Sequence, residues 1–123
     1  MKKILVIDDE MAVGEIVKDF LDELGYQTFI AQDAIVGMKL VEKEKPDLIL
    51  LDVLMPKIGG LEALRRIKEI YPEAIIVVMS GLQDEQIAKQ AIRRGAYDYI
   101  SKPFDLIQIQ KDLLARIFPE EAQ

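Results

Sequence analysis

Five short runs of branched apolar residues recur along the chain, and a longer segment with helical periodicity follows each one. The first, third and fourth runs are continuously apolar, which is typical of strands buried on both faces of a parallel sheet. The second and fifth runs are more mixed, as expected of edge strands. The expected strands are Ile4–Ile7, Gln27–Ala31, Leu48–Leu51, Ile75–Met79 and Tyr97–Ile100.

The segments between these runs place apolar residues three and four positions apart, which is the pattern of helices with one buried face. The expected helices are Met11–Leu24, Asp33–Glu44, Leu61–Ile70, Asp84–Arg94 and Leu106–Phe118. The apolar face expected for the first helix consists of Val13, Ile16, Val17, Phe20, Leu21 and Leu24, and Gly25 would close that helix. Strict alternation of strand and helix predicts the α/β class. We expect a doubly wound, five-stranded parallel sheet with five helices and the flavodoxin-like strand order 2-1-3-4-5.

Composition and charge narrow the classes of partner. The 123 residues fit one domain, expected over residues 1–119, with an acidic tail at 120–123. The net charge of −6 argues against direct binding to nucleic acid or to an anionic membrane surface. The apolar stretches are too short to span a bilayer, and Asp8-Asp9-Glu10 interrupts the first one too early for an export signal. We therefore expect a cytoplasmic protein.

The chain has no cysteine and no histidine, so its chemistry must use carboxylates, hydroxyls, lysines and the backbone. Polar residues gather where the expected strands end. These strand ends are Asp8-Asp9-Glu10, Asp52, Ser80-Gly81 and Ser101-Lys102-Pro103. The carboxyl ends of strands form the ligand crevice of open α/β sheets, and the first and third strands are neighbours in this order. Asp8, Asp9 and Asp52 should therefore converge.

Three crowded carboxylates raise one another's pKa values, and a hard cation such as Mg²⁺ relieves that repulsion. Lys102 adds a positive charge suited to a phosphate oxygen, and Ser80 adds a hydroxyl donor. Each residue alone has an ordinary explanation, such as Asp9 acting as the N-cap of the first helix. Together they indicate phosphoryl transfer to a carboxylate nucleophile.

At these residues the chain resembles the receiver domain of two-component response regulators. The matching segments are Ile4–Glu10, Leu50–Pro56, Val78–Gly81 and Tyr97–Phe104. The resemblance implies that Asp52 accepts the phosphoryl group. Mg²⁺ would be held by Asp9, Asp52 and the backbone carbonyl of Leu54, with Asp8 acting through water.

The resemblance also implies roles for residues of the last two strand ends. Lys102 would contact the phosphoryl group, and its bond to Pro103 would be cis. Ser80 would be the switch hydroxyl, and Tyr99 the aromatic residue that turns inward with it. The expected partners are a histidine kinase or phosphotransfer protein, then an effector domain or protein. The face made by the fourth helix, fifth strand and fifth helix would change its preference, and it could also join two copies as a homodimer on phosphorylation.

Two leucines depart from the commonest pattern of the family, Leu54 and Leu82. In relatives with polar residues these two side chains flank the path of the hydrolytic water. Leucine cannot orient that water, so we expect a long-lived phosphorylated form.

Three other functions remain to be weighed. An aspartate-nucleophile hydrolase of the haloacid-dehalogenase type would need a second acid where Leu54 stands. A flavodoxin-like FMN carrier would need a phosphate loop where Asp8-Asp9-Glu10 would repel the phosphate. A degenerate receiver that only binds proteins would lack Asp52 or Lys102. We expect no turnover of an external substrate, and hence no enzyme in the usual sense.

Overall fold

The sheet has five parallel strands in the order β2-β1-β3-β4-β5, which confirms the predicted α/β fold. This computed structural model describes residues 1–55, 58–81, 85–103 and 105–121. The strands are β1 (Lys3–Ile7), β2 (Gln27–Ala31), β3 (Leu48–Asp52), β4 (Ile76–Ser80) and β5 (Asp98–Ser101). As predicted, the two more polar runs form the edges of the sheet, and the three apolar runs form its centre.

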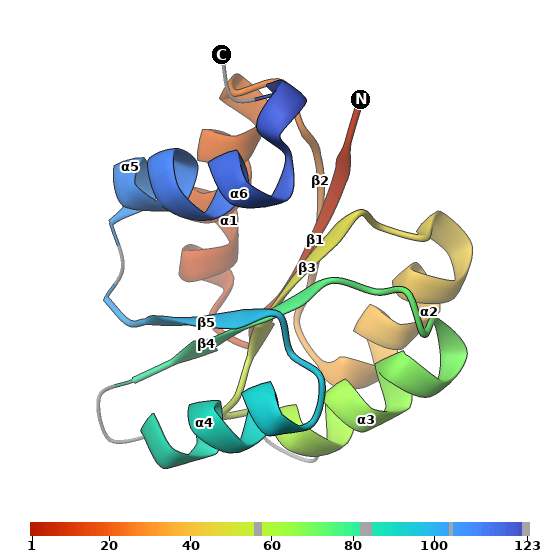
Figure 1. Ribbon diagram of the computed structural model, residues 1–123. Helices are drawn as coiled ribbons and strands as arrows, with labels where there is room; N and C mark the ends of the chain where they lie inside the picture. The colour runs from red at the N-terminus through yellow and green to blue at the C-terminus, as the bar shows by residue number, and fades with distance from the viewer. Residues whose placement is uncertain (56–57, 82–84, 104, 122–123) are drawn as a thin grey trace.

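Helices cover both faces of the sheet (Figure 1). The helices after the first four strands are α1 (Met11–Glu23), α2 (Ala34–Glu44), α3 (Gly60–Ile70) and α4 (Glu85–Arg93). The last helix runs continuously through α5 (Leu106–Gln108), the π-helical segment η2 (Ile109–Leu114) and α6 (Ala115–Ile117). A 3₁₀ turn, η3 (Pro119–Glu121), follows it and includes the first two residues of the expected acidic tail.

The π-helical segment was not expected, and the spacing of the buried residues explains it. Ile109, Leu113, Leu114 and Phe118 are all buried on the same side of the sheet. At about 100° per residue, a regular α-helix would leave Phe118 roughly half a turn away from Ile109. The wider π turn reduces the rotation per residue and brings both side chains to the sheet.

Alternate strand residues supply two separate hydrophobic cores. Ile4, Val6, Leu48 and Leu50 pack on the side covered by α1 and the last helix. Leu5, Ile7, Ile49 and Leu51 pack on the side covered by α2, α3 and α4. This two-sided burial is why the central strands, apart from Lys3 at the start of β1, have no polar residue before their carboxyl ends.

Helix α1 differs from its expected apolar face at Ile16, whose side chain is 59% exposed, and at the C-cap residue Leu24, which is 36% exposed. The buried positions of α1 are Gly14, Val17 and Leu21. A Cβ at Gly14 would lie 3.0 Å from the Ile30 side chain, so the helix rests on β2 along this line and Ile16 turns away. Gly25 ends the helix as predicted, following the C-cap residue Leu24 with a φ of +97°. Within the described ranges, no helix has the length and apolarity needed to cross a membrane.

Candidate functional site

Three charged residues lie on the same side of the sheet at its carboxyl edge. Asp8 follows β1, Asp52 ends β3, and Lys102 follows β5. Each continues the alternation of residues that face α1 and the last helix, such as Val6 and Leu50. The Lys102 ammonium therefore reaches both acids: Nζ lies 2.8 Å from Asp8 Oδ2 and 3.3 Å from Asp52 Oδ2.

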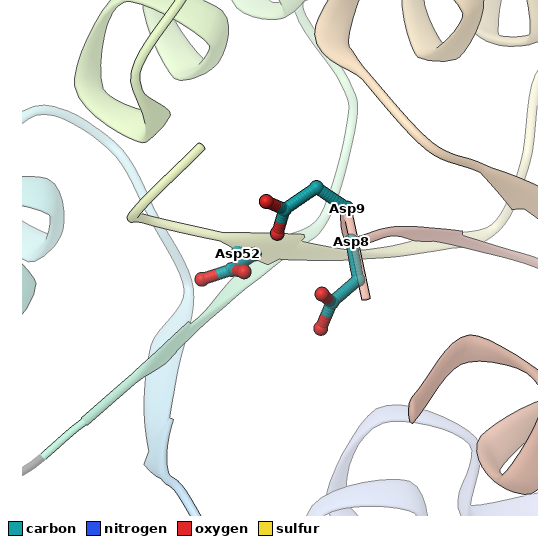
Figure 2. A group of neighbouring side chains, drawn as sticks. All are labelled: Asp8, Asp9 and Asp52. Atoms are coloured by element: carbon teal, nitrogen blue, oxygen red, sulfur yellow. The ribbon is translucent and has the colours of Figure 1, made fainter. Parts of the chain in front are cut away.

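Asp9 completes an acidic cluster with Asp8 and Asp52. One carboxylate oxygen from each residue lies within 4.8 Å of the others. Figure 2 shows Asp8 and Asp9 turned to opposite sides of the strand, with the Asp9 carboxylate reaching toward Asp52. Asp8 and Asp52 are buried, whereas Asp9 is exposed. The predicted convergence of the three acids is therefore confirmed. The N-cap explanation for Asp9 is wrong, because Glu10 occupies the N-cap position of α1.

Backbone groups fix the two buried carboxylates. The Glu10 N–H donates to Asp8 Oδ1 at 2.9 Å, and the Leu54 N–H donates to Asp52 Oδ1 at 3.1 Å. The start of α3 holds the segment after β3 in place, since the Gly60 N–H donates to the Val53 carbonyl at 3.0 Å. A Cβ at Gly60 would lie 2.4 Å from Val53 Cα, so only glycine permits this approach.

The electrostatics of the site place one lysine among several acids. Burial raises the pKa of Asp52 to about 6, and the charge of Asp8 adds to this; the Leu54 N–H and Lys102 act in the opposite direction. Burial alone would lower the pKa of Lys102. The hydrogen bond to Asp8 and the charges of Asp52 and Asp8 outweigh burial, so the pKa of Lys102 is raised. Lys102 therefore stays protonated, while the pKa of Asp52 lies closer to neutral pH than that of an ordinary aspartate.

Ser80 and Tyr99 lie on the other side of the sheet from Lys102. Val78 pairs with Tyr99, and Ser80 pairs with Ser101, so Ser80 and Tyr99 are diagonal neighbours facing α4. Ser80 is buried and belongs to β4 as its last residue. Tyr99 is half-buried against the core on that side.

The segments that follow β3 and β5 bring the remaining predicted residues to the carboxyl edge of the sheet. The Lys102 N–H donates to the Ser80 carbonyl at 2.6 Å, and the predicted cis bond between Lys102 and Pro103 is present. Leu54 is 55% exposed at the rim. Leu82 lies outside the described residues.

Glu10 is a site residue that the sequence reasoning did not single out. Its Oε1 lies 3.7 Å from Lys102 Nζ. A signal was available, because a glutamate directly before α1 is a poor N-cap and therefore invites another explanation.

The donor set fits a magnesium ion. Asp8, Asp9 and Asp52 offer only oxygen, the ligand type that Mg²⁺ prefers, and their spacing allows them to share one ion. Such an ion would also balance the excess of acids over Lys102. With such an ion bound, the Asp52 carboxylate could act as a nucleophile.

Comparisons with known proteins identify the family. A family model described as the response regulator receiver domain matches residues 4–114. The chain is 31% identical to sporulation initiation phosphotransferase F of Bacillus subtilis, covering 96% of this chain and 94% of that protein. It is 37% identical to the probable C4-dicarboxylate response regulator DctR of the same organism, and here the match covers 90% of this chain but 50% of that protein. The crystal structure of the receiver domain of NtrX from Brucella abortus superimposes with a TM-score of 0.83 at 35% identity, over 97% of each chain.

Proposed function

This chain belongs to the response regulator receiver domain family, as its sequence resemblance predicted, and we propose that it is phosphorylated on Asp52. One observation carries this proposal: the Asp8, Asp9 and Asp52 carboxylates converge, with the Lys102 ammonium in contact with Asp8 and Asp52. Receiver domains take part in two-component signalling, and their relatives are regulators. We infer that this chain likewise turns over no external substrate.

Asp9 and Asp52 would hold Mg²⁺ together with the Leu54 carbonyl, with Asp8 acting through water. The ion supplies positive charge that makes an anionic donor acceptable among three acids. Asp8 and the Leu54 N–H keep Lys102 and Asp52 in place during this step. Because Lys102 already contacts Asp52 Oδ2, it needs only a small movement to bind an oxygen of the incoming phosphoryl group.

In the phosphoryl transfer, an Asp52 carboxylate oxygen attacks the phosphorus of the donor. A new O–P bond forms, and the bond from phosphorus to the donor breaks, with its electron pair leaving on the donor group. The natural donor would be a phosphohistidine of a histidine kinase or phosphotransfer protein, since this chain has no histidine of its own.

The signal would pass through Ser80 and Tyr99. Ser80 would move toward the phosphoryl group and free space on the α4 side of the sheet, where Tyr99 is half-buried. The face of α4, β5 and the last helix would then shift its preference for an effector domain, an effector protein or a second copy of this chain.

The effector that receives the signal could be a separate protein or a domain attached to this one. The chain spans nearly the whole of one relative but half of another. The cytoplasmic location and the absence of direct nucleic-acid and membrane binding stay predictions. The slow loss of phosphate that we expect from Leu54 and Leu82 also stays a prediction.

Mass spectrometry after incubation with Mg²⁺ and acetyl phosphate tests the assignment. Wild-type protein should gain one phosphoryl group, and Asp52→Asn should gain none. Asp19→Asn, which removes an exposed carboxylate from α1, is the matched control and should be labelled like wild type. Labelling of Asp52→Asn to the wild-type level would exclude Asp52 as the acceptor.

A further inference from the structure

Glu10 lies between solvent and the acidic cluster of Asp8, Asp9 and Asp52, and its side chain does not cap helix α1. It is the N-cap of α1, yet its side chain makes no capping hydrogen bond. Short side chains such as Ser and Asp are preferred there because they reach the free backbone N–H groups of the first turn. The Glu10 carboxylate turns to Lys102 instead, with Oε1 3.7 Å from Nζ, and remains 66% exposed. Departures of this kind from local sequence preference are expected at functional or strained sites.

Lys102 joins Glu10 to the phosphoryl acceptor. Asp8 and Asp52 contact the ammonium from the buried side, and Glu10 contacts it from the solvent side. The two Lys102 distances place Glu10 Oε1 no more than about 7 Å from Asp52 Oδ2. That separation is within the screening length of about 8 Å at physiological ionic strength, so the Glu10 charge acts on any ion that approaches Asp52.

We propose that Glu10 sets the donor preference of the site by disfavouring phosphodonors of high negative charge. This inference rests on the proposed phosphorylation of Asp52. A donor must bring its phosphorus to the Asp52 carboxylate, and therefore into the field of Glu10. Repulsion by one carboxylate grows in proportion to the donor charge, so a dianionic donor loses about twice the interaction energy that a monoanionic donor loses.

Two small donors separate charge from chemistry. Acetyl phosphate is a dianion: the bond from phosphorus to the acetyl oxygen breaks, and acetate leaves with the electron pair. Phosphoramidate carries a net single negative charge near neutral pH: the P–N bond breaks, and ammonia leaves. Both give the same acyl phosphate on Asp52. For each donor, the leaving group is the same in wild type and variant. Its effect on the rate therefore cancels when the variant rate is divided by the wild-type rate.

The experiment compares Glu10→Gln with wild type at saturating Mg²⁺, measuring the phosphorylation rate per donor concentration. Glu10→Gln should accelerate labelling by acetyl phosphate about two- to fivefold at low salt. The acceleration with phosphoramidate should be about the square root of that factor, and both should shrink at about 1 M salt. Glu10→Asp, which keeps the charge, should keep the wild-type ratio between donors. Asp19→Asn is the control, since it removes an equal charge further along α1.

A second measurement reads the contact without Mg²⁺. The NMR signal of the Lys102 side-chain ammonium should shift in Glu10→Gln and stay in place in Asp19→Asn. An unmoved Lys102 signal, equal acceleration with both donors, or no acceleration in Glu10→Gln would each overturn the inference. Wild-type protein that takes up no phosphoryl group from either donor would instead refute the proposed function itself.

Discussion

Two clusters of ion pairs in this chain have similar distances and opposite electrostatics. On α3, Glu62 accepts hydrogen bonds from Arg65 at 2.6 Å and from Arg66 at 2.9 Å, and Arg65 also pairs with Glu69. Hydrogen bonds from Arg65 and Arg66 lower the pKa of Glu62 to about 2. At the carboxyl edge, Lys102 lies 3.3 Å from Asp52, yet burial raises the pKa of Asp52 to about 6.

Burial and the balance of charges account for the difference. The α3 cluster has as many arginines as glutamates, and its side chains are 41–61% exposed, so water can still reach the charged groups. At the carboxyl edge, the buried Asp8 and Asp52 share a single ammonium and have lost their hydration. A short ion-pair distance therefore does not by itself mark a stabilising interaction. At the carboxyl edge, the buried carboxylates of Asp8 and Asp52 destabilise the fold, and a bound cation can relieve that destabilisation.

Removing the ammonium should produce the largest effect. Lys102→Met leaves Asp8 and Asp52 buried without a positive partner, so we expect the metal-free protein to lose about 3 kcal/mol of unfolding free energy near pH 7.5. The loss should be smaller near pH 5, where Asp52 takes up a proton. Urea unfolding in chelator measures both values. Lys111→Met, an exposed lysine of the last helix, is the control, and an equal loss in both variants would contradict the argument.

Neutralising Asp52, the proposed phosphoryl acceptor, should raise the unfolding free energy of the metal-free protein rather than lower it. The pKa of Asp52 is raised from 3.8 to about 6 in the folded state, so the native protein binds the proton more tightly than the unfolded chain does. The stability that this group contributes is complete below pH 3.8 and is lost as the pH rises through about 6. Metal-free Asp52→Asn lacks this loss.

Asp52→Asn should therefore exceed wild type by on the order of 2–3 kcal/mol above about pH 7, because a difference of one pKa unit corresponds to about 1.4 kcal/mol. The difference should grow between about pH 4 and pH 6, as followed by urea unfolding in chelator. Asp19→Asn serves again as the exposed control. A difference that stays constant over this pH range would show that ionisation of Asp52 is not its source.

The carboxyl edge also shows how far the sequence alone could lead. Strand order and the convergence of Asp8, Asp9 and Asp52 follow from alternation of apolar runs and from acids placed at strand ends. Both depend on the backbone pattern, which a sequence displays directly. The contact between Glu10 and Lys102 joins residues 92 positions apart, and it depends on where a flexible side chain turns.

Packing geometry explains two of the differences between the predicted and the observed helices. The exposed Ile16 follows from Gly14 meeting Ile30, and periodicity cannot reveal which side of a broad apolar face meets the sheet. The π-helical segment follows from Phe118 sharing a core with Ile109, which the apolar spacing hints at but does not determine.

Adding the cation should remove the cost at the carboxyl edge. If Mg²⁺ binds only the folded protein, a concentration ten times the dissociation constant stabilises the fold by about 1.4 kcal/mol. The melting temperature of wild type should then rise by a few degrees, and that of Asp9→Ala should not. Metal-free Asp9→Ala should be at least as stable as wild type, because one acid has left the cluster. An Asp9→Ala protein that gains as much from Mg²⁺ as wild type does would remove Asp9 from the ligand set.

Breaking the α3 cluster should have the smallest effect, although it contains as many ion pairs as the carboxyl edge. Arg65→Gln removes contacts with Glu62 and Glu69, but Arg66 remains on Glu62, and all of these side chains are solvated. We expect a melting temperature within the scatter of repeated wild-type measurements, at low salt and at about 1 M salt alike, because exposed pairs are screened and hydrated. Arg94→Gln, an exposed arginine just after α4, is the control for loss of one positive charge. If Arg65→Gln instead lowered the melting temperature as much as Lys102→Met does, burial would not be what separates the two clusters.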